Sequence, residues 1–227
     1  MSCVAIIVAA GHGRRMGFDK LMAEVAGKSV LQWSLDAFLA CESVSSAVIV
    51  TDEERFSTLQ FSDDKPVFRI DGGPERYLSV VEGFKAAPPK STYAAIHDGA
   101  RPLVRPEQIE QCIREARDSG AAALARQATE TLKKVSHDGF TRSSVPRENL
   151  WIMETPQVFR MKMLTRAYDL VLSRRMQVTD DVSAVEAIGV PTKVVENIHP
   201  NHKITVPADL PIVETLLNAR LSESAAP

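Results

Sequence analysis

Several basic residues lie within a short glycine-rich segment near the start of the chain. The segment runs from Gly11 to Lys20 and contains two further glycines, with Arg14 and Arg15 between them. Glycine lets backbone amides approach a ligand closely, and clustered cations match the oxygens of phosphate groups. A continuous apolar run at 4–10 precedes the segment, as expected of a strand buried on both faces. We therefore predict a phosphate-binding loop at the carboxyl end of a parallel strand.

The loop matches neither of the common nucleotide motifs. Its glycines fall at relative positions one, three and seven, whereas a dinucleotide fingerprint needs one, three and six. Gly27-Lys28-Ser29 supplies the end of a P-loop, but Met22 stands where the first glycine of that motif belongs. The alternative is an ordinary glycine turn with solvated arginines. Three cations within seven residues favour a phosphate loop of a third kind.

Four more polar segments fall at or near the ends of predicted strands: 71–79, 98–101, 155–157 and 203–205. The carboxyl ends of strands in an open parallel sheet share one crevice. Arg101 and Lys203 are therefore expected beside Arg15 and Lys20 around one polyphosphate, with Asp98 among them. The alternatives are that Asp98 is a turn aspartate beside a glycine and that Arg101 belongs to a fixed turn with the following proline.

Other candidate residues have simpler structural interpretations. We interpret His97 as a packed residue at a strand end, because no second ligand lies at metal spacing nearby. Asp180 and Asp181 are interpreted as a helix N-terminal cap. We find no Ser-His-Asp or Cys-His constellation. A reaction at phosphorus needs none, because a phosphate monoester is itself a charged nucleophile that the protein has only to align and neutralise.

Short strands and helices alternate along most of the chain. Strands are predicted at 4–10, 47–51, 67–70, 93–97, 121–125, 151–159 and 192–195, and helices at 29–40, 53–59, 76–87, 106–119, 161–174, 180–188 and 207–221. This alternation predicts an α/β fold with a parallel, doubly wound sheet in a single domain over 1–221. A flexible tail is expected at 222–227.

The polar segment 127–149 interrupts this alternation. A turn at His137-Asp138-Gly139 separates two short strand patterns at 131–135 and 140–145, which predicts a protruding β-arm. The alternating apolar residues Leu132, Val135 and Val145 need a surface to lie against. We therefore predict a homodimer formed through this arm.

Bulk properties exclude several classes of protein. The chain has 227 residues and a formal net charge of −2, so nothing indicates nucleic-acid binding, and the cations of the loop must act locally. No segment approaches the ~20 apolar residues of a membrane-spanning helix. Cysteines 3, 41 and 112 are odd in number and widely spaced, as in reduced cytosolic proteins. We expect a soluble, cytoplasmic protein.

The polar segments, taken in order, resemble a known family. They read Ala9-Ala10-Gly11-His12-Gly13-Arg14-Arg15-Met16, Asp19-Lys20, Asp71-Gly72-Gly73, His97-Asp98-Gly99-Ala100-Arg101-Pro102, Thr155-Pro156-Gln157 and Lys203-Ile204-Thr205. In this order they are similar to the 2-C-methyl-D-erythritol 4-phosphate cytidylyltransferases, and the resemblance extends from residue 4 to about 215. It implies a three-layer, mostly parallel twisted sheet flanked by helices, of the nucleotide-diphosphosugar-transferase-like and Rossmann-like type, with a dimerising β-arm.

The resemblance also implies an activity and a set of site residues. The activity is the coupling of CTP to a four-carbon polyol phosphate, with release of pyrophosphate and with Mg²⁺ held mainly through the CTP phosphates rather than by protein ligands. Implied catalytic residues are Arg15, Lys20 and Lys203. Implied nucleotide-binding residues are Ala9, Ala10, Gly11, Gly13, Gly73, Ser79, Asp98 and Gly99. Implied substrate-binding residues are Asp98, Arg101, Thr131, Arg147 and Thr155, with Thr131 and Arg147 coming from the partner's arm.

Some residues depart from the family pattern, and two other functions remain open. Pro74, Tyr77 and Leu78 stand where the family usually has polar, acidic or small residues. The first alternative is a D-ribitol-5-phosphate cytidylyltransferase, although Ala100 favours methylerythritol phosphate because the ribitol enzymes tend to carry a bulkier residue there. The second is a non-catalytic CTP-binding regulatory dimer, which would not need so many cations around one phosphorus.

Overall fold

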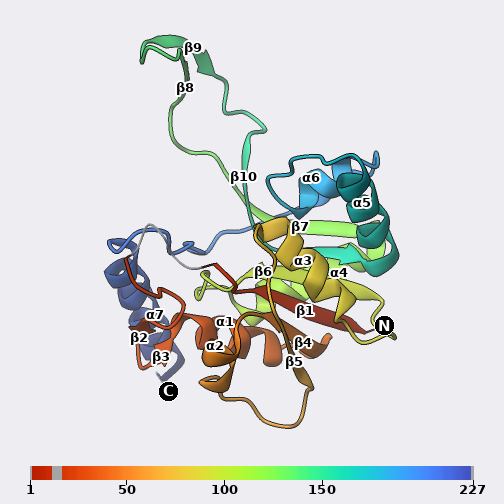
Figure 1. The fold of residues 1–227 in the computed structure, drawn as a ribbon. Helices are drawn as coiled ribbons and strands as arrows, with labels where there is room; N and C mark the ends of the chain where they lie inside the picture. The colour runs from red at the N-terminus through yellow and green to blue at the C-terminus, as the bar shows by residue number, and fades with distance from the viewer. Residues whose placement is uncertain (1, 12–16, 226–227) are drawn as a thin grey trace.

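The computed structural model describes residues 2–11 and 17–225 of the chain (Figure 1). Its elements are β1 (Cys3–Val8), β2 (Glu24–Val25), β3 (Lys28–Ser29), α1 (Val30–Leu39), β4 (Val44–Val50), α2 (Glu53–Ser57), β5 (Val67–Ile70), α3 (Arg76–Lys85), β6 (Tyr93–Asp98), α4 (Pro106–Ser119), β7 (Ala121–Gln127), β8 (Leu132–Val135), β9 (Thr141–Val145), β10 (Trp151–Arg160), α5 (Met161–Ser173), α6 (Asp181–Glu186), β11 (Lys193–Glu196) and α7 (Asp209–Ala225). The sequence predicted most of these elements but missed the small β2–β3 hairpin.

Seven strands form one sheet in the order β11-β7-β10-β6-β1-β4-β5. Strand β1 lies near the middle and pairs in parallel with β4 and β6, while β10 pairs antiparallel with both β6 and β7. The mostly parallel sheet that we predicted is therefore confirmed, with β10 as the strand of opposite direction.

Apolar cores lie on both faces of the sheet. Successive side chains of a strand point to opposite faces, and in β1 Ala5 and Ile7 join one core while Val4 and Ile6 join the other. Helices α1, α4 and α7 contribute buried residues to the first core, and α3, α5 and α6 contribute to the second. The three-layer arrangement implied by the sequence is confirmed (Figure 1).

Local capping chemistry sets several helix boundaries where the sequence predicted them. The Ser29 hydroxyl accepts a hydrogen bond from the Gln32 amide at 3.2 Å and begins α1. Helix α4 ends at Gly120, whose φ of 90° is the left-handed conformation that glycine adopts most easily.

Helix α7 runs to Ala225, past the predicted end at 221 and into the segment that we expected to be a flexible tail.

The predicted arm is present as a separate two-stranded sheet. Strands β8 and β9 pair antiparallel and project far from the main sheet (Figure 1). Near its tip, Val135 is 57% exposed and Phe140 is 69% exposed. Large apolar side chains on so thin a projection have no core of their own to join.

Two further findings concern the chain as a whole. In the described parts of the chain, no helix combines the length and the apolar character needed to cross a membrane. The three cysteines are buried and unpaired, as expected of reduced thiols. Burial raises the pKa of Cys3 and of Cys41 to about 12, so both thiols are protonated and unreactive at neutral pH.

Candidate active site

The backbone segments that follow β1, β5 and β6 lie against one another at the carboxyl edge of the sheet. A Cβ atom added to Gly72 would lie 2.1 Å from Ala10 Cβ, and one added to Gly99 would lie 2.9 Å from Leu31 Cδ1 and 3.2 Å from the Val8 carbonyl oxygen. These contacts leave no room for a side chain at either glycine. The structure thus brings together three of the segments that the sequence predicted to share a crevice.

Ser79 organises the segment that follows β5. Its hydroxyl accepts a hydrogen bond from the Gly73 amide at 3.1 Å and lies 3.3 Å and 3.2 Å from the carbonyls of Gly73 and Glu75. Gly73 itself has no space for a side chain, because a Cβ there would lie 2.5 Å from Leu78 Cβ. Ser79 is buried at the start of α3 and holds the Gly73 backbone at the sheet edge.

Asp98 lies at the centre of a cluster of cations, at the end of β6. Its Oδ2 lies 2.7 Å from Lys203 Nζ and 3.7 Å from Arg101 Nε, and its Oδ1 lies 2.8 Å from Arg76 Nε. Burial alone would raise the pKa of this carboxyl, but the charges of Arg76 and Lys203 outweigh burial and hold it well below its usual range. Asp98 is therefore ionised and orients three basic side chains from different segments.

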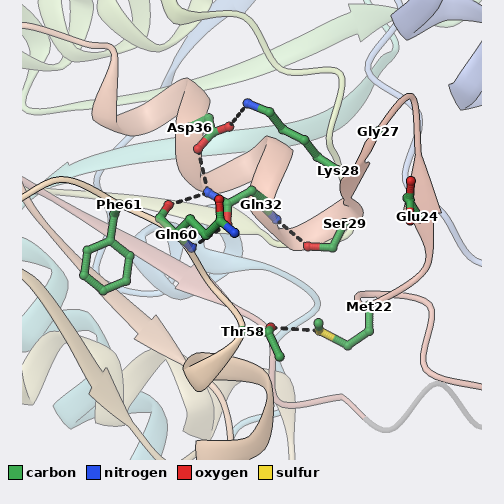
Figure 2. A pocket seen from close by; sticks show the side chains of 10 residues that line it. All are labelled: Met22, Glu24, Gly27, Lys28, Ser29, Gln32, Asp36, Thr58, Gln60 and Phe61. Carbon is green, nitrogen blue, oxygen red and sulfur yellow. Dashed lines mark hydrogen bonds and ion pairs between the residues drawn. The ribbon is translucent and has the colours of Figure 1, made fainter.

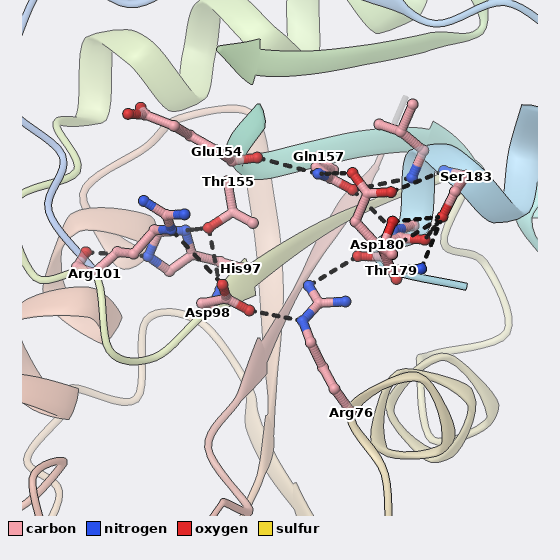
Figure 3. Close-up of polar contacts among 12 residues, drawn as sticks. Arg76, His97, Asp98, Arg101, Glu154, Thr155, Gln157, Thr179, Asp180 and Ser183 are labelled. Carbon is pink, nitrogen blue, oxygen red and sulfur yellow. Dashed lines mark hydrogen bonds and ion pairs between the residues drawn. The ribbon is translucent and has the colours of Figure 1, made fainter. Parts of the chain in front are cut away.

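Arg76 is the member of this cluster that the sequence reasoning missed. Its Nη2 lies 3.0 Å from Asp181 Oδ2, so one guanidinium joins two buried aspartates. Figure 3 shows its contact with Asp98. Tyr168 donates its hydroxyl hydrogen to the other oxygen of Asp181. Burial disfavours the charged guanidinium, yet the two carboxylates raise the pKa of Arg76 above its ordinary value. Its position within the polar segment 71–79, close to a predicted strand end, was the signal in the sequence that could have revealed it.

The two neighbouring aspartates have different roles. Asp180 Oδ1 accepts a hydrogen bond from the Ser183 amide at 3.0 Å, which confirms it as the N-cap of α6. Asp181 is fully buried and pairs with Arg76, so the capping interpretation is wrong for this second residue. A buried carboxylate is retained when a cation and hydrogen-bond donors compensate its loss of hydration.

His97 and Thr155 support Asp98 from within the protein. The Thr155 hydroxyl accepts a hydrogen bond from the Asp98 amide at 3.2 Å and lies 2.9 Å from His97 Nδ1 (Figure 3). His97 Nε2 lies 3.2 Å from the Arg101 carbonyl, which can only accept. Burial lowers the pKa of His97 to about 3, so the ring is neutral with its proton on Nε2. The predicted packed role of His97 is confirmed, and Thr155 is buried beneath Asp98.

The low pKa of His97 predicts a specific loss of stability in acid. Between pH 6.5 and about 3 the unfolded chain binds a proton at His97 that the folded chain does not. The free energy of unfolding should therefore fall by up to about 1.4 kcal/mol per pH unit as the pH drops through this range. In urea titrations at several pH values, His97→Gln should remove this slope, whereas His137→Gln on the exposed arm should keep it. An unchanged slope in His97→Gln would contradict the assignment.

Lys20 contacts the backbone of the segment that contains Lys203. Lys20 Nζ lies 2.5 Å from the Ile204 carbonyl, and the Ile204 amide donates to the Ala100 carbonyl at 2.9 Å. The segment at 203–205 therefore lies between the glycine loop and the end of β6. The structure thus brings together three of the four cations predicted for the crevice. Gly13 and Arg15 lie outside the described residues.

The predicted position of the 155–157 segment at a strand end is wrong. Thr155 and Gln157 lie within β10, which is antiparallel to its neighbours β6 and β7. The middle of this strand, and not its end, therefore lies at the crevice. The amide oxygen of Gln157 accepts hydrogen bonds from the amides of Asp181 and Val182, each at 3.1 Å. This side chain links β10 to the start of α6 and so fixes Asp181 against Arg76.

A cleft of about 470 Å³ opens beside these groups. Its lining residues are Arg76, Asp98, Arg101, Met153, Glu154, Thr155, Gln157, Thr179, Asp180, Val182, Ser183, Glu186 and Lys203. Thr131 and Arg147 lie on the arm and do not line this cleft, and Arg147 donates to the Thr129 carbonyl. The structure of a single chain therefore leaves these two predicted substrate ligands apart from the site.

A second cleft, of about 590 Å³, has a different character (Figure 2). Its polar groups bind one another: Gln32 exchanges hydrogen bonds of 2.7 and 2.8 Å with the Gln60 backbone, and Lys28 Nζ lies 2.6 Å from Asp36 Oδ2. Of the described residues that line this cleft, Lys28 is the one cation. The first cleft is therefore the better candidate for binding a polyphosphate.

The mostly parallel sheet and the basic crevice at its edge are those of an α/β nucleotidyltransferase. A family model described as 2-C-methyl-D-erythritol 4-phosphate cytidylyltransferase matches residues 3–219, and the chain belongs to this family. It is 38% identical to the enzyme of that name from Prochlorococcus marinus, over 95% of this chain and 97% of the relative. It is 35% identical to the one from Synechocystis, over 97% of this chain and 99% of the relative.

Solved structures agree with this assignment. The 4-diphosphocytidyl-2C-methyl-D-erythritol synthase of Anaerococcus prevotii superposes with a TM-score of 0.85 at 29% identity, covering 95% of this chain and 96% of that one. The 2-C-methyl-D-erythritol 4-phosphate cytidylyltransferase of Francisella tularensis gives a TM-score of 0.82 at 29% identity, covering 95% and 100%. The fold and family implied by the sequence are both confirmed.

Proposed function

We propose that the protein transfers CMP from CTP to 2-C-methyl-D-erythritol 4-phosphate, forming 4-diphosphocytidyl-2-C-methyl-D-erythritol and pyrophosphate in non-mevalonate isoprenoid biosynthesis. Membership of the family supports this activity, and the cations gathered around Asp98 are the structural observation that carries it. Arg101 lines the same cleft, where a phosphate or hydroxyl oxygen of a bound substrate would reach its side chain.

The reaction requires little covalent chemistry from the protein. An oxygen of the polyol phosphate attacks the α-phosphorus of CTP, a new phosphorus–oxygen bond forms, and the bond to the β-phosphate breaks so that pyrophosphate leaves. Negative charge builds on the attacked phosphoryl group, and Lys20 and Lys203 would stabilise it. The Ala9, Ala10 and Gly73 backbone would position the nucleotide, and this alignment replaces a general base.

Mg²⁺ is proposed as the cofactor, bound mainly through the phosphates of CTP. Within residues 2–11 and 17–225, no three His, Cys, Asp or Glu side chains gather as a protein-only metal site would require. Such a cage is not needed for Mg²⁺, which usually keeps several waters and binds through substrate phosphates. Both oxygens of Asp98 already pair with Arg76 and Lys203, so the phosphates of CTP and water would supply the ligands in this cleft. The metal would supply charge neutralisation of the triphosphate.

The decisive experiment measures pyrophosphate release with Mg²⁺, each of the four nucleotides and two polyol phosphates. We expect turnover with CTP and methylerythritol phosphate above all other pairs. Faster turnover with ribitol 5-phosphate would instead support a ribitol-phosphate cytidylyltransferase, and CTP binding without turnover would support a regulatory protein. Absence of turnover with CTP and either polyol phosphate would overturn the proposal.

We also propose a cytoplasmic homodimer that is joined through the arm at 127–149. The exposure of Val135 and Phe140 supports an interface on this arm, because isolated apolar side chains gain stability when a second surface covers them. Thr131 and Arg147 of the partner subunit would then reach the substrate phosphate. Sedimentation equilibrium should give twice the chain mass of 24.9 kDa, and a monomer at micromolar concentration would contradict the dimer.

A further inference from the structure

The guanidinium of Arg55 contacts described residues on both sides of positions 12–16 of the glycine loop. Its Nη1 donates to the Ala9 carbonyl at 2.9 Å and its Nη2 to the Gly11 carbonyl at 3.4 Å. Its Nε lies 2.5 Å from Asp19 Oδ2. The side chain is only 7% exposed, so one buried cation joins residues on either side of the loop.

The contacts to the two carbonyls also orient the backbone. A trans peptide group is planar, with its C=O and N–H pointing in opposite directions. Because the Ala9 carbonyl points to Arg55, the amide N–H of Ala10 must point away from Arg55. An anion-binding segment needs amides turned to one side, and the Ala10 amide is turned away from Arg55 in this way.

Asp19 links Arg55 to the backbone on either side of Lys20. Its Oδ2 pairs with Arg55 while its Oδ1 accepts a hydrogen bond from the Leu21 amide at 3.0 Å. Lys20 therefore lies between two backbone positions that the same carboxylate holds. A group that stabilises a transition state is effective only when it is held in place before the reaction.

Arg55 also pairs with Asp52, which lies outside the glycine loop. This residue is the N-cap of α2, where its Oδ1 accepts from the Arg55 amide at 2.9 Å. Its Oδ2 lies 3.0 Å from Arg55 Nη1. Asp52 and Asp19 thus pair with the same guanidinium and have similar exposure, 43% and 35%, but only Asp19 belongs to the loop.

We propose that Arg55 is a positioning residue of the nucleotidyltransferase site, which preorganises the glycine loop and Lys20 by holding Ala9, Gly11 and Asp19 together. Arg55 contacts no group that reacts, and it acts through the residues it holds. The inference rests on the proposed function, since it concerns the loop that receives the triphosphate of CTP.

The matched pair of aspartates provides the test. Asparagine keeps one side-chain oxygen, so Asp19→Asn retains the bond from Leu21 and Asp52→Asn retains the helix cap, while both place an amide against Arg55. We expect similar, small decreases in Tm. Turnover should separate them, with kcat/KM for CTP falling about 10-fold to 100-fold in Asp19→Asn and staying at the wild-type value in Asp52→Asn.

Arg55→Lys provides a second measurement, because lysine keeps the charge but cannot reach two carbonyls and a carboxylate together. It should lower kcat/KM for CTP as far as Asp19→Asn does, and combining the two changes should add little further loss. Equal turnover in Asp19→Asn and Asp52→Asn, or wild-type turnover in Arg55→Lys, would overturn the proposal.

The wild-type protein in the same assay separates this proposal from the proposed function. Absence of wild-type turnover would count against the proposed function alone. The positioning role is then decided by titration calorimetry with CTP. Weaker CTP binding in Asp19→Asn than in Asp52→Asn supports it, and equal binding overturns it.

Discussion

Replacing Lys20 with alanine is expected to lower kcat for pyrophosphate release by about 10²- to 10³-fold, the cost of removing one preorganised charge from a transition state. Lys20 donates to the Ile204 carbonyl, one residue after Lys203, and we propose that it lies where charge builds on the attacked phosphoryl group. Affinity for CTP should fall much less, because an interaction that strengthens in the transition state affects kcat more than binding. Single-turnover kinetics measure the rate of the chemical step, and calorimetric titration measures the affinity for CTP.

Lys28→Ala is the matched control for this experiment. Lys28 is also a lysine near the amino-terminal loop, but it pairs with Asp36 at the second cleft, and the structure gives it no contact with the Asp98 cluster. Its removal should leave kcat unchanged. If Lys20→Ala weakened CTP binding and turnover by the same factor, Lys20 would be a ground-state binding residue instead.

Replacing Asp98 with asparagine is expected to damage both stability and activity. Asp98 is buried, and the change leaves Arg76, Lys203 and Arg101 close together without the carboxylate that neutralises them. Removing one partner of a buried ion pair typically costs about 3–5 kcal/mol. The three cations should then repel one another and move, which lowers kcat/KM by about 100-fold or more. Urea unfolding and the pyrophosphate assay measure the two effects.

Asp71→Asn is the control for stability. Asp71 also pairs with an arginine, at 2.6 Å from Arg69 Nη1, but its side chain is 78% exposed. An exposed pair contributes about 0–1 kcal/mol, so this variant should unfold nearly like the wild type. A stability loss in Asp98→Asn no larger than in Asp71→Asn would contradict the central position that we assign to Asp98. If Asp98→Asn does not fold, Lys203→Met tests the same cluster from its more exposed side.

Local patterns in the sequence were sufficient to predict most of the architecture. Ser29 begins α1 and Gly120 ends α4 because capping depends on side chains and backbone angles within one turn of the helix. The paired strands of the arm follow from an equally local turn. The family could be predicted because each of its motifs is a short, continuous segment. Asp98 could be placed among cations because the ends of parallel strands share one edge.

The tertiary structure alone decided which distant side chains share the site. The direction of β10 could not be read from its composition, because a buried strand shows the same apolar pattern in either direction. Arg76 meets Asp181 across 105 positions and Arg55 meets Asp19 across 36, and both contacts depend on how the sheet orders its strands. The sequence alone predicted which types of residue would bind phosphate. Which of them face one another depended on strand order and register, because these arise from packing the whole chain and not from any one segment.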